Sequence, residues 1–355
     1  MNRYSKTLVI LTPGFAASEA DSTCLPMQQA LVRTVKENYP ELNIVILSFQ
    51  YPFFKRTYQW YGTTVISFGG KNRRGFSKRL LRPKIYSALK EIQRTNNIIG
   101  LLSFWYGECA WVGKRFADKN DLRHYCWLLG QDAKKGNKYV KDIRLKAGEL
   151  IALSDFLQDE FERNYGIRPE HVIPPGVSTI CSDVPIKEKD IDIIAAGSLI
   201  PLKQYEILLE VIAAIKKERP GVSAVLMGDG PERERLQSII SSKELEQNII
   251  LTGELPHPEV LQWMQRGRIF LHPSSYEGFG VVCLEALQAG CRVISFCRPM
   301  KQETEQWDIV QDKEEMIQKI ISLLQDKENG YKSVAPFLMD DIAKKMIELF
   351  YDGYY

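Results

Sequence analysis

Short aliphatic runs alternate with longer amphipathic stretches along most of this chain. An aliphatic run of this length fits a buried strand, and apolar residues at helical spacing fit a helix that covers one face of a sheet. Strand and helix in alternation favour a mostly parallel sheet with helices on both faces. In the first half the predicted strands are Leu8–Leu11, Ile44–Ser48, Val65–Phe68, Ile98–Ser103, Tyr125–Leu129 and Leu150–Leu153, with helices such as Pro26–Asn38 and Pro83–Thr95.

The same alternation returns in the second half, after a polar, proline-bounded stretch that has neither helical nor strand period. We predict a first domain at 1–175, a linker at 176–190 and a second domain at 191–335, followed at 336–355 by a helix that packs back toward the first domain. The second-half strands are expected at Ile191–Ala195, Ser223–Met227, Ile249–Leu251, Ile269–His272 and Val293–Phe296, and the helices at Tyr205–Glu218, Pro231–Ser242, Pro258–Arg266, Gly280–Gln288, Glu314–Asp326 and about Met339–Tyr351.

The fold class expected from this pattern is α/β, with two Rossmann-like domains that face each other across a cleft. Ligands of such sheets bind at the carboxyl ends of the strands. The length of 355 residues allows two separate cores, and an apolar fraction of 45% with 26% charged residues is ordinary for a soluble protein. A net charge of +3 excludes a general polyanion binder, so we expect no nucleic-acid partner.

Compartment signals favour the cytoplasm. No stretch approaches the roughly 20 apolar residues of a membrane span, and the short apolar run before Pro13 and Gly14 reads better as a first strand than as a signal peptide. The seven cysteines form no C-x-x-C pair and no cysteine–histidine metal spacing. We interpret most of them as small buried thiols in a reducing compartment and expect no metal site.

A basic cluster with interleaved apolar residues lies within Lys71–Lys84. A solvated helix face is the commoner explanation for such a cluster, and a membrane-surface or acidic-acceptor patch is the functional alternative. The second interpretation would place the protein peripherally at the inner membrane face. The cluster comprises Lys71, Arg73, Arg74, Lys78, Arg79, Arg82 and Lys84, with Phe76, Leu80 and Leu81 between them.

Glu277 and Glu285 flank a glycine-bounded turn that leads into a predicted helix. Gly278 and Gly280 leave the main chain open to a ligand, and the first N–H groups of a helix have no partner inside it. Glu285 stands on a largely apolar helix, where a carboxylate without a partner is costly. A helix-dipole role would explain either glutamate alone. Together they favour a ligand with hydroxyls and phosphates, such as a sugar nucleotide.

Two further loops end strands of the same predicted sheet. A glycine and a lysine, Gly197 and Lys203, bracket the first of them. An ordinary strand-to-helix loop would look the same, but its place beside the Glu277 loop favours phosphate binding, with Lys203 as the cation. Gly228 ends the next strand in a tight turn that borders the same site.

The histidines and the acidic pair near the linker are weaker signals. We interpret His272 as a packed, hydrogen-bonded strand-end residue and His257 as a candidate for lining a base pocket. Asp190 and Asp192 form a D-x-D at the entry to a strand, where edge charge explains them better than a metal does.

In the first domain, polar residues follow three predicted strands and could face an acceptor. Gly14 belongs to the loop after the first strand. Glu108 and Asp132 are the carboxylates placed to contact sugar hydroxyls, although each is about equally suited to capping a helix. Trp105 and Tyr106 could form a stacking platform for a sugar ring or belong to the core at the domain edge.

The Glu277–Glu285 element resembles the E-x7-E motif of the retaining GT-B glycosyltransferases of family four, and the block from Gly197 to Lys203 resembles their G-R-L-x-x-x-K loop. The resemblance covers nearly the whole chain and is strongest from Ile191 to Phe296. It implies that Glu277 contacts the transferred sugar and Glu285 the ribose diol. It also implies backbone contacts to sugar and phosphates from Gly278, Phe279 and Gly280, with Lys203 on the diphosphate.

Two positions depart from the family pattern. The arginine of the phosphate loop is Ser198 here, and the histidine that many members carry in the first domain is Leu129, with Asp132 the nearest polar substitute. The implied catalytic set is therefore Glu277, Lys203 and Asp132.

The resemblance implies a metal-independent transfer from a nucleoside diphosphate sugar to an acceptor hydroxyl, with retained configuration. No cofactor is expected. The expected acceptor is a glycan or a lipid-linked glycan, in cell-surface glycan or glycolipid synthesis. The alternatives are a non-catalytic nucleotide-sugar-binding protein, which Ser198 and Leu129 would support, and a GT-B epimerase or phosphorylase.

Overall fold

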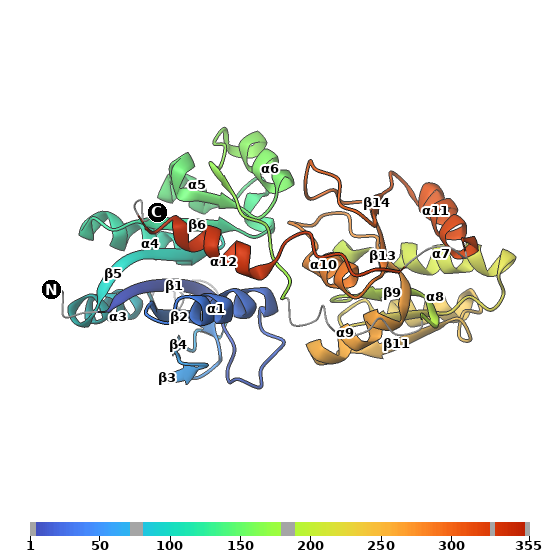
Figure 1. Ribbon diagram of the computed structural model, residues 1–355, viewed down its shortest axis with the longest axis horizontal. Helices are drawn as coiled ribbons and strands as arrows, with labels where there is room; N and C mark the ends of the chain where they lie inside the picture. Colours follow the sequence, from blue (N-terminus) through green and yellow to red (C-terminus); the bar gives the residue numbers. More distant parts are fainter. Residues whose placement is uncertain (1–4, 72–80, 179–188, 327–330, 352–355) are drawn as a thin grey trace. The chain divides into compact units, whose positions relative to one another are not determined.

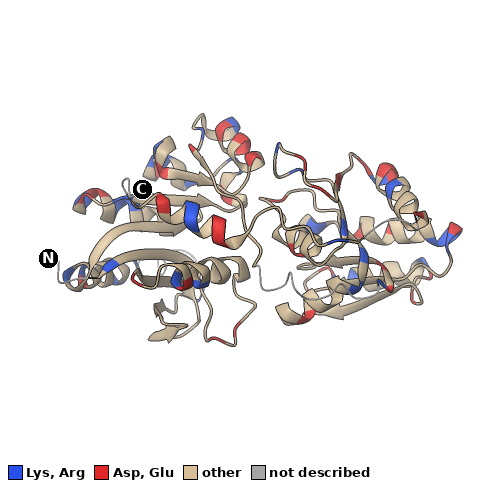
Figure 2. Ribbon diagram, viewed as in Figure 1, with Lys and Arg blue, Asp and Glu red and all other residues tan. Residues whose placement is uncertain are grey.

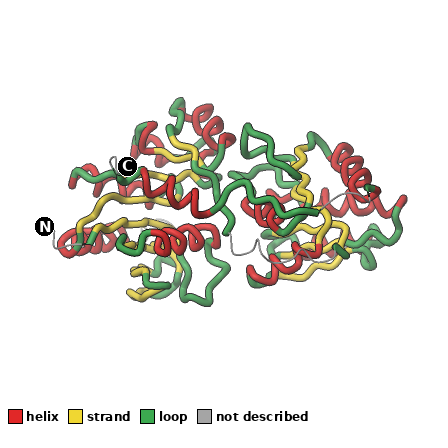
Figure 3. Tube along the Cα trace, in the orientation of Figure 1, coloured by secondary structure: helices red, strands yellow, loops and turns green. Residues whose placement is uncertain are grey.

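The computed structural model describes residues 5–71, 81–178, 189–326 and 331–351. The chain divides into two compact units (Figure 1): Met1–Gly176 together with Met339–Tyr355, and Val177–Leu338. Each unit is a sheet covered by helices, as the strands, helices and loops of Figure 3 show. Within the described residues, no helix has the length and apolarity needed to cross a membrane.

The first unit contains an eight-stranded sheet of order β3-β4-β2-β1-β5-β6-β7-β8. All neighbouring strands are parallel except β3 and β4, which form an antiparallel hairpin at one edge. The central strands are buried on both faces, which explains their nearly continuous aliphatic runs. The strands are β1 Lys6–Gly14, β2 Asn43–Tyr51, β3 Lys55–Trp60, β4 Thr63–Phe68, β5 Asn97–Phe104, β6 His124–Leu128, β7 Leu150–Ala152 and β8 His171–Val172.

Helices cover this sheet. α3 and α4 bury Ile85, Leu89 and Phe116 in one core cluster with residues of β1 and β2. α12 lies over the sheet beside α1 (Figure 1), where Asn38 donates a hydrogen bond of 2.8 Å to Asp340. The helices of this unit are α1 Pro26–Asn38, α3 Leu81–Thr95, α4 Glu108–Asn120, α5 Lys138–Ile143, α6 Asp155–Tyr165 and α12 Met339–Glu348.

The second unit is a six-stranded, fully parallel sheet of order β11-β10-β9-β12-β13-β14. This is the doubly wound Rossmann order, in which the chain starts at the centre and builds outward in both directions. The strands are β9 Ile191–Ala196, β10 Ala224–Met227, β11 Ile249–Gly253, β12 Gly267–His272, β13 Arg292–Ser295 and β14 Trp307–Ile309. The helices are α7 Tyr205–Glu218, α8 Arg233–Ser242, α9 His257–Arg266, α10 Val281–Gln288 and α11 Lys313–Gln325.

The core of the second unit follows the amphipathic spacing of its helices. Leu208, Ile212 and Ile215 of α7 lie on one helical face and are buried against Ile193 and Leu226 of the sheet. Charged residues of both signs are intermixed on outer helices such as α6 and α12, whereas most strand residues are uncharged (Figure 2).

The predicted α/β class with two Rossmann-like domains is confirmed. Three strands were missed, each for an identifiable reason. β3 is a polar edge strand with mostly exposed residues, and β8 and β14 are only two and three residues long, too short to show a period. The last helix ends at Glu348, shorter than predicted. There Phe350 packs on Tyr125 with ring centroids 5.1 Å apart.

Candidate functional site

The strand order of the second unit reverses between β9 and β12, and the candidate site lies at this switch point. The loop after β9 carries Gly197 and a short 3-10 turn, Pro201–Lys203. The loop after β12 carries Glu277 and leads into α10. The two loops are joined directly, because the Ser275 N–H donates to the carbonyl of Leu202 at 3.1 Å. Carboxyl ends of strands at such a point are the usual ligand site of this fold.

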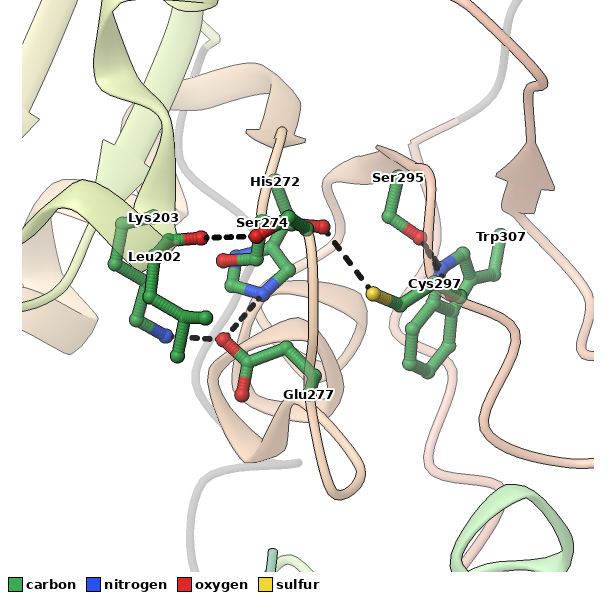
Figure 4. A network of polar contacts seen from close by, with 9 residues as sticks. Leu202, Lys203, His272, Ser274, Glu277, Ser295, Cys297 and Trp307 are labelled. Atoms are coloured by element: carbon green, nitrogen blue, oxygen red, sulfur yellow. Dashed lines mark hydrogen bonds and ion pairs between the residues drawn. The ribbon is translucent and has the colours of Figure 1, made fainter. Parts of the chain in front are cut away.

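The carboxylate of Glu277 is the centre of the site. Figure 4 shows the Lys203 ammonium and the His272 ring both directed at it. Lys203 Nζ forms an ion pair with Glu277 Oε1, and His272 Nε2 lies 3.1 Å from the same oxygen. An ionised carboxylate can only accept, so Nε2 of His272 carries the hydrogen. Both ion-pair partners are largely buried, with 17% and 16% of their side chains exposed.

Burial and charge act in opposite directions on Glu277. Burial raises its pKa, but the hydrogen bond from His272 and the positive charge of Lys203 outweigh this and lower the pKa to about 2. Burial lowers the pKa of His272, which is only 2% exposed. Glu277 is therefore an anion and His272 a neutral donor near pH 7. The interpretation of His272 as packed and hydrogen-bonded agrees with this geometry, but the sequence did not show that its partner is Glu277.

Glycines allow the loops after β9 and β10 to touch. A Cβ on Gly228, which has φ of +138°, would lie 2.0 Å from the carbonyl oxygen of Gly197. A Cβ on Gly230 would lie 2.5 Å from the carbonyl oxygen of Leu199. Both contacts are too short for any side chain, so glycine is required there. The structure places Gly228 against Gly197, so the turn after β10 packs directly on the loop after β9.

The start of α10 follows the Glu277 loop directly, and the first N–H groups of a helix have no acceptor within the helix itself. Gly280 occupies the N-cap position in the left-handed region, with φ of +80°. Gly278 is buried, and Phe279 is a core residue, 2% exposed, whose ring packs edge-on against Trp307 and Phe337. Phe279 thus anchors the loop through its ring, and its side chain is not available to a ligand.

Glu285 lies one turn into α10, and its carboxylate is hydrogen-bonded to a histidine of α9. His257, the first residue of α9, places Nε2 at 2.7 Å from Glu285 Oε1. The hydrogen bond to Glu285 raises the pKa of His257, although burial opposes it. This pair is more open than the Glu277 pair, since 31% of the His257 side chain is exposed. Glu285 is therefore not a plainly solvated helix residue.

Ser198 is exposed where the resembled family has arginine. Beneath the same loop lies Tyr205, the first residue of α7, whose hydroxyl is buried and has no hydrogen-bond partner among the described residues. Tyr205 was not among the site residues predicted from the sequence. A tyrosine two positions after a phosphate-loop lysine was the available signal, because tyrosine is chosen over phenylalanine where a hydroxyl has a partner.

The predicted acceptor-side carboxylate Asp132 is used by the backbone of the first unit. Its carboxylate accepts N–H groups from Tyr106 at 2.8 Å, Gly130 at 2.8 Å and Leu129 at 3.2 Å. Burial raises the pKa of Asp132 and these N–H groups oppose it. The contacts favour the structural alternative for Asp132 over the catalytic one.

The other first-domain candidates are mostly structural as well. Tyr106 is 1% exposed, stacks on Phe161 at 5.7 Å and accepts the N–H of Leu145, so it is core and not a stacking platform. Glu108 is buried and paired with Arg82 at 2.9 Å. Trp105 is half-buried with φ of +64°, and Gly14 is buried at the end of β1.

Most of the basic cluster lies outside the described residues. Arg73, Arg74, Lys78 and Arg79 belong to that part, whereas Lys71 and Lys84 are exposed. The D-x-D acids are paired with arginines and not arranged for a metal: Asp190 accepts from Arg266 at 3.0 Å and Asp192 from Arg219 at 3.1 Å.

Comparison with known proteins agrees with this geometry. Residues 179–333 match the family model of the glycosyl transferases group 1. The gpi3 subunit of phosphatidylinositol N-acetylglucosaminyltransferase from Schizosaccharomyces pombe is 35% identical over 164 residues, which cover 45% of this chain and 36% of that protein. The chain thus spans well under two thirds of the curated relatives that it matches.

Solved structures match along nearly the whole chain. Sucrose-phosphate synthase from Thermosynechococcus elongatus superposes with a TM-score of 0.72 at 17% identity, covering 97% of this chain and 98% of that one. HepE from Anabaena, solved with UDP and glucose, gives 0.70 at 16% identity, covering 97% and 99%. The predicted GT-B fold is confirmed by these structures.

Proposed function

We propose that this protein is a retaining, metal-independent glycosyltransferase that moves a sugar from a nucleoside diphosphate sugar to an acceptor hydroxyl. The observation that carries the proposal is the convergence of Lys203 and His272 on the carboxylate of Glu277, at the start of α10. Lys203, His272 and Glu277 can give up contacts with one another and form contacts with a ligand instead. Lys203 and the helix N–H groups suit a diphosphate, and Glu277 suits sugar hydroxyls.

The chemistry requires stabilisation of the leaving diphosphate while the bond to the sugar's anomeric carbon breaks. Lys203 and the first N–H groups of α10 supply fixed positive charge and dipoles for this. The leaving phosphate can accept the proton of the acceptor hydroxyl on the same face of the sugar, which gives retention. A strong protein base is then unnecessary, which fits an Asp132 whose carboxylate is held by backbone N–H groups.

The ribose of the donor is assigned to the Glu285 end of the site. A carboxylate accepts both hydroxyls of a diol, and His257 holds Glu285 at 2.7 Å. The two glutamates would therefore hold opposite ends of one nucleotide sugar. Glycan or lipid-linked acceptors are proposed because the Schizosaccharomyces pombe relative bears the name of a phosphatidylinositol glycosyltransferase subunit.

A contact with the inner face of a membrane is part of the proposal. Beside the basic cluster, a cavity of about 770 Å³ is lined by residues that include Tyr86, Lys90 and Trp111. The guanidinium groups of Arg82 and Arg115 lie 3.9 and 4.0 Å from the Trp111 ring. Cations around an amphipathic aromatic suit an anionic lipid surface.

Charge reversal at Arg73, Arg74 and Arg79 should reduce binding to phosphatidylglycerol vesicles. Unchanged binding would show that the basic cluster is only a solvated surface.

The central experiment measures donor turnover. The protein is incubated with UDP-, GDP- and ADP-sugars, and release of the nucleoside diphosphate is followed with and without acceptors. We expect slow donor hydrolysis that Glu277→Ala abolishes and EDTA does not affect. An anomeric assignment of the product by NMR tests retention. Tight donor binding without turnover under any acceptor would instead support the non-catalytic binding protein.

A further inference from the structure

The hydroxyl of Tyr205 is a buried hydrogen-bond donor next to the loop after β9. Tyr205 is 4% exposed, and its hydroxyl has no hydrogen-bond partner among the residues that the structure describes. Tyr165 of the first unit behaves differently, since its hydroxyl accepts the Asn137 N–H at 2.8 Å and donates to the Lys134 carbonyl. A buried hydroxyl that makes no hydrogen bond lowers stability, and phenylalanine would fill the same volume without that penalty.

The Tyr205 hydroxyl lies against Gly197, in the loop after β9. A Cβ built on Gly197 would be 2.7 Å from the Tyr205 oxygen, 3.6 Å from Cε of Lys203 and 3.9 Å from its Nζ. The Tyr205 hydroxyl and the Lys203 ammonium therefore both lie near the position that a side chain on Gly197 would occupy. Burial raises the pKa of Tyr205 and the nearby negative charge of Glu277 adds to the rise, so the hydroxyl keeps its proton and can only gain by finding an acceptor.

No side chain in the described part of the chain supplies that acceptor. Glu277, whose negative charge acts on Tyr205, is already bound to Lys203 and His272. An anionic ligand oxygen seated over Gly197 would reach both Lys203 and Tyr205. The exposed Ser198 leaves this loop one cation short of the pattern that it resembles.

We propose that Tyr205 donates its hydroxyl hydrogen to the diphosphate of the bound nucleotide sugar, as a second phosphate contact beside Lys203. The proposal rests on the function proposed above, because it takes the diphosphate from the donor substrate. It adds a binding residue that belongs to this chain and not to the E-x7-E or glycine–lysine elements.

The test compares Tyr205→Phe with Tyr165→Phe. Affinities for UDP, GDP and ADP are measured by calorimetry, together with the Tm of each unliganded protein. For the nucleotide that the wild type binds best, Tyr205→Phe should weaken binding about tenfold, because the lost hydrogen bond is to a charged oxygen. Its unliganded Tm should stay equal or rise. Tyr165→Phe should lower the Tm and leave the affinity unchanged.

The matching nucleoside separates loss of a contact from a general distortion. If Tyr205→Phe weakens the nucleoside as much as the nucleoside diphosphate, the hydroxyl does not act on the diphosphate and the proposal is wrong. It is also wrong if the affinity is unchanged, or if only the unliganded Tm falls, since the hydroxyl then has a structural partner. A wild type that binds none of the three nucleotides would overturn the proposed function itself.

Discussion

The carboxyl edges of the two sheets carry similar residue types but use them differently. In the second unit, Lys203, Glu277 and His272 satisfy one another through side-chain contacts. In the first unit, the carboxylate of Asp132 is satisfied by backbone N–H groups from Tyr106 and Gly130. Both edges look equally polar along the sequence. The difference is the kind of partner that each carboxylate has.

The kind of partner decides what each edge can do. Side chains that hold one another can turn to a ligand of matching charge, because the ligand replaces one ionic contact by another. Backbone N–H groups cannot turn away, so a carboxylate that holds them fixes the loop and is not released. The second unit therefore has a binding site ready for exchange, and the first unit has a rigid edge.

The largest effect is expected at Glu277. Glu277→Gln keeps the size of the side chain but removes its charge, so Lys203 loses its ion-pair partner and the sugar loses an anionic acceptor. We expect transfer to fall about 10³-fold, as when a preorganised polar group of an active site is removed. Glu314→Gln, at an exposed position of α11, is the matched control and should leave the rate unchanged. A rate for Glu277→Gln within a few-fold of wild type would contradict the assignment.

Lys203→Ala should have the next largest effect. Among the described residues, the Lys203 ammonium forms the ion pair with the Glu277 carboxylate, and its loss should weaken nucleoside diphosphate binding about 10- to 100-fold. Lys217→Ala, on the exposed face of α7, is the control. Binding is measured by calorimetry, and unchanged affinity would refute the phosphate assignment.

Asp132 tests the other side of the comparison. Asp132→Ala leaves three N–H groups without their acceptor, so we expect a loss of about 1–3 kcal/mol in the free energy of unfolding. Nucleotide affinity should not change. If stability were unaffected while the turnover of a known acceptor fell strongly, Asp132 would act in catalysis and the contrast between the two edges would be lost.

The two sheets and the donor half of the site could be predicted because their signals are local. Aliphatic runs marked the central strands, and the glycines around Glu277 marked a loop that leads into a helix. Strand–helix alternation also predicts parallel sheets covered by helices, but it does not give the order of the strands. What is missing from such patterns is the partner of each side chain.

Partners depend on contacts between distant residues. His272 binds Glu277 only because the loop turns back on its own strand, and Tyr205 lies under Gly197 because α7 starts there. Asp132 was predicted to be a catalytic acid because the sequence does not show which groups its carboxylate binds. One of them, the N–H of Tyr106, is remote in sequence. Strand-end position indicates where a site can be, and three-dimensional contacts decide whether the residue is free to serve it.

The smallest effect separates the two histidine–glutamate pairs by pH. The hydrogen bond to Glu285 raises the pKa of His257 above 6.5, so its contribution to stability is complete below pH 6.5 and is lost as the pH rises through the folded-state value. Burial lowers the pKa of His272, so its protonation opposes folding only as the pH falls below 6.5. His257→Gln should remove a decline in Tm of about 1–3 °C on the alkaline side. NMR titration of the two imidazoles checks the order: His257 must titrate at the higher pH, and the reverse order would contradict the assigned environments.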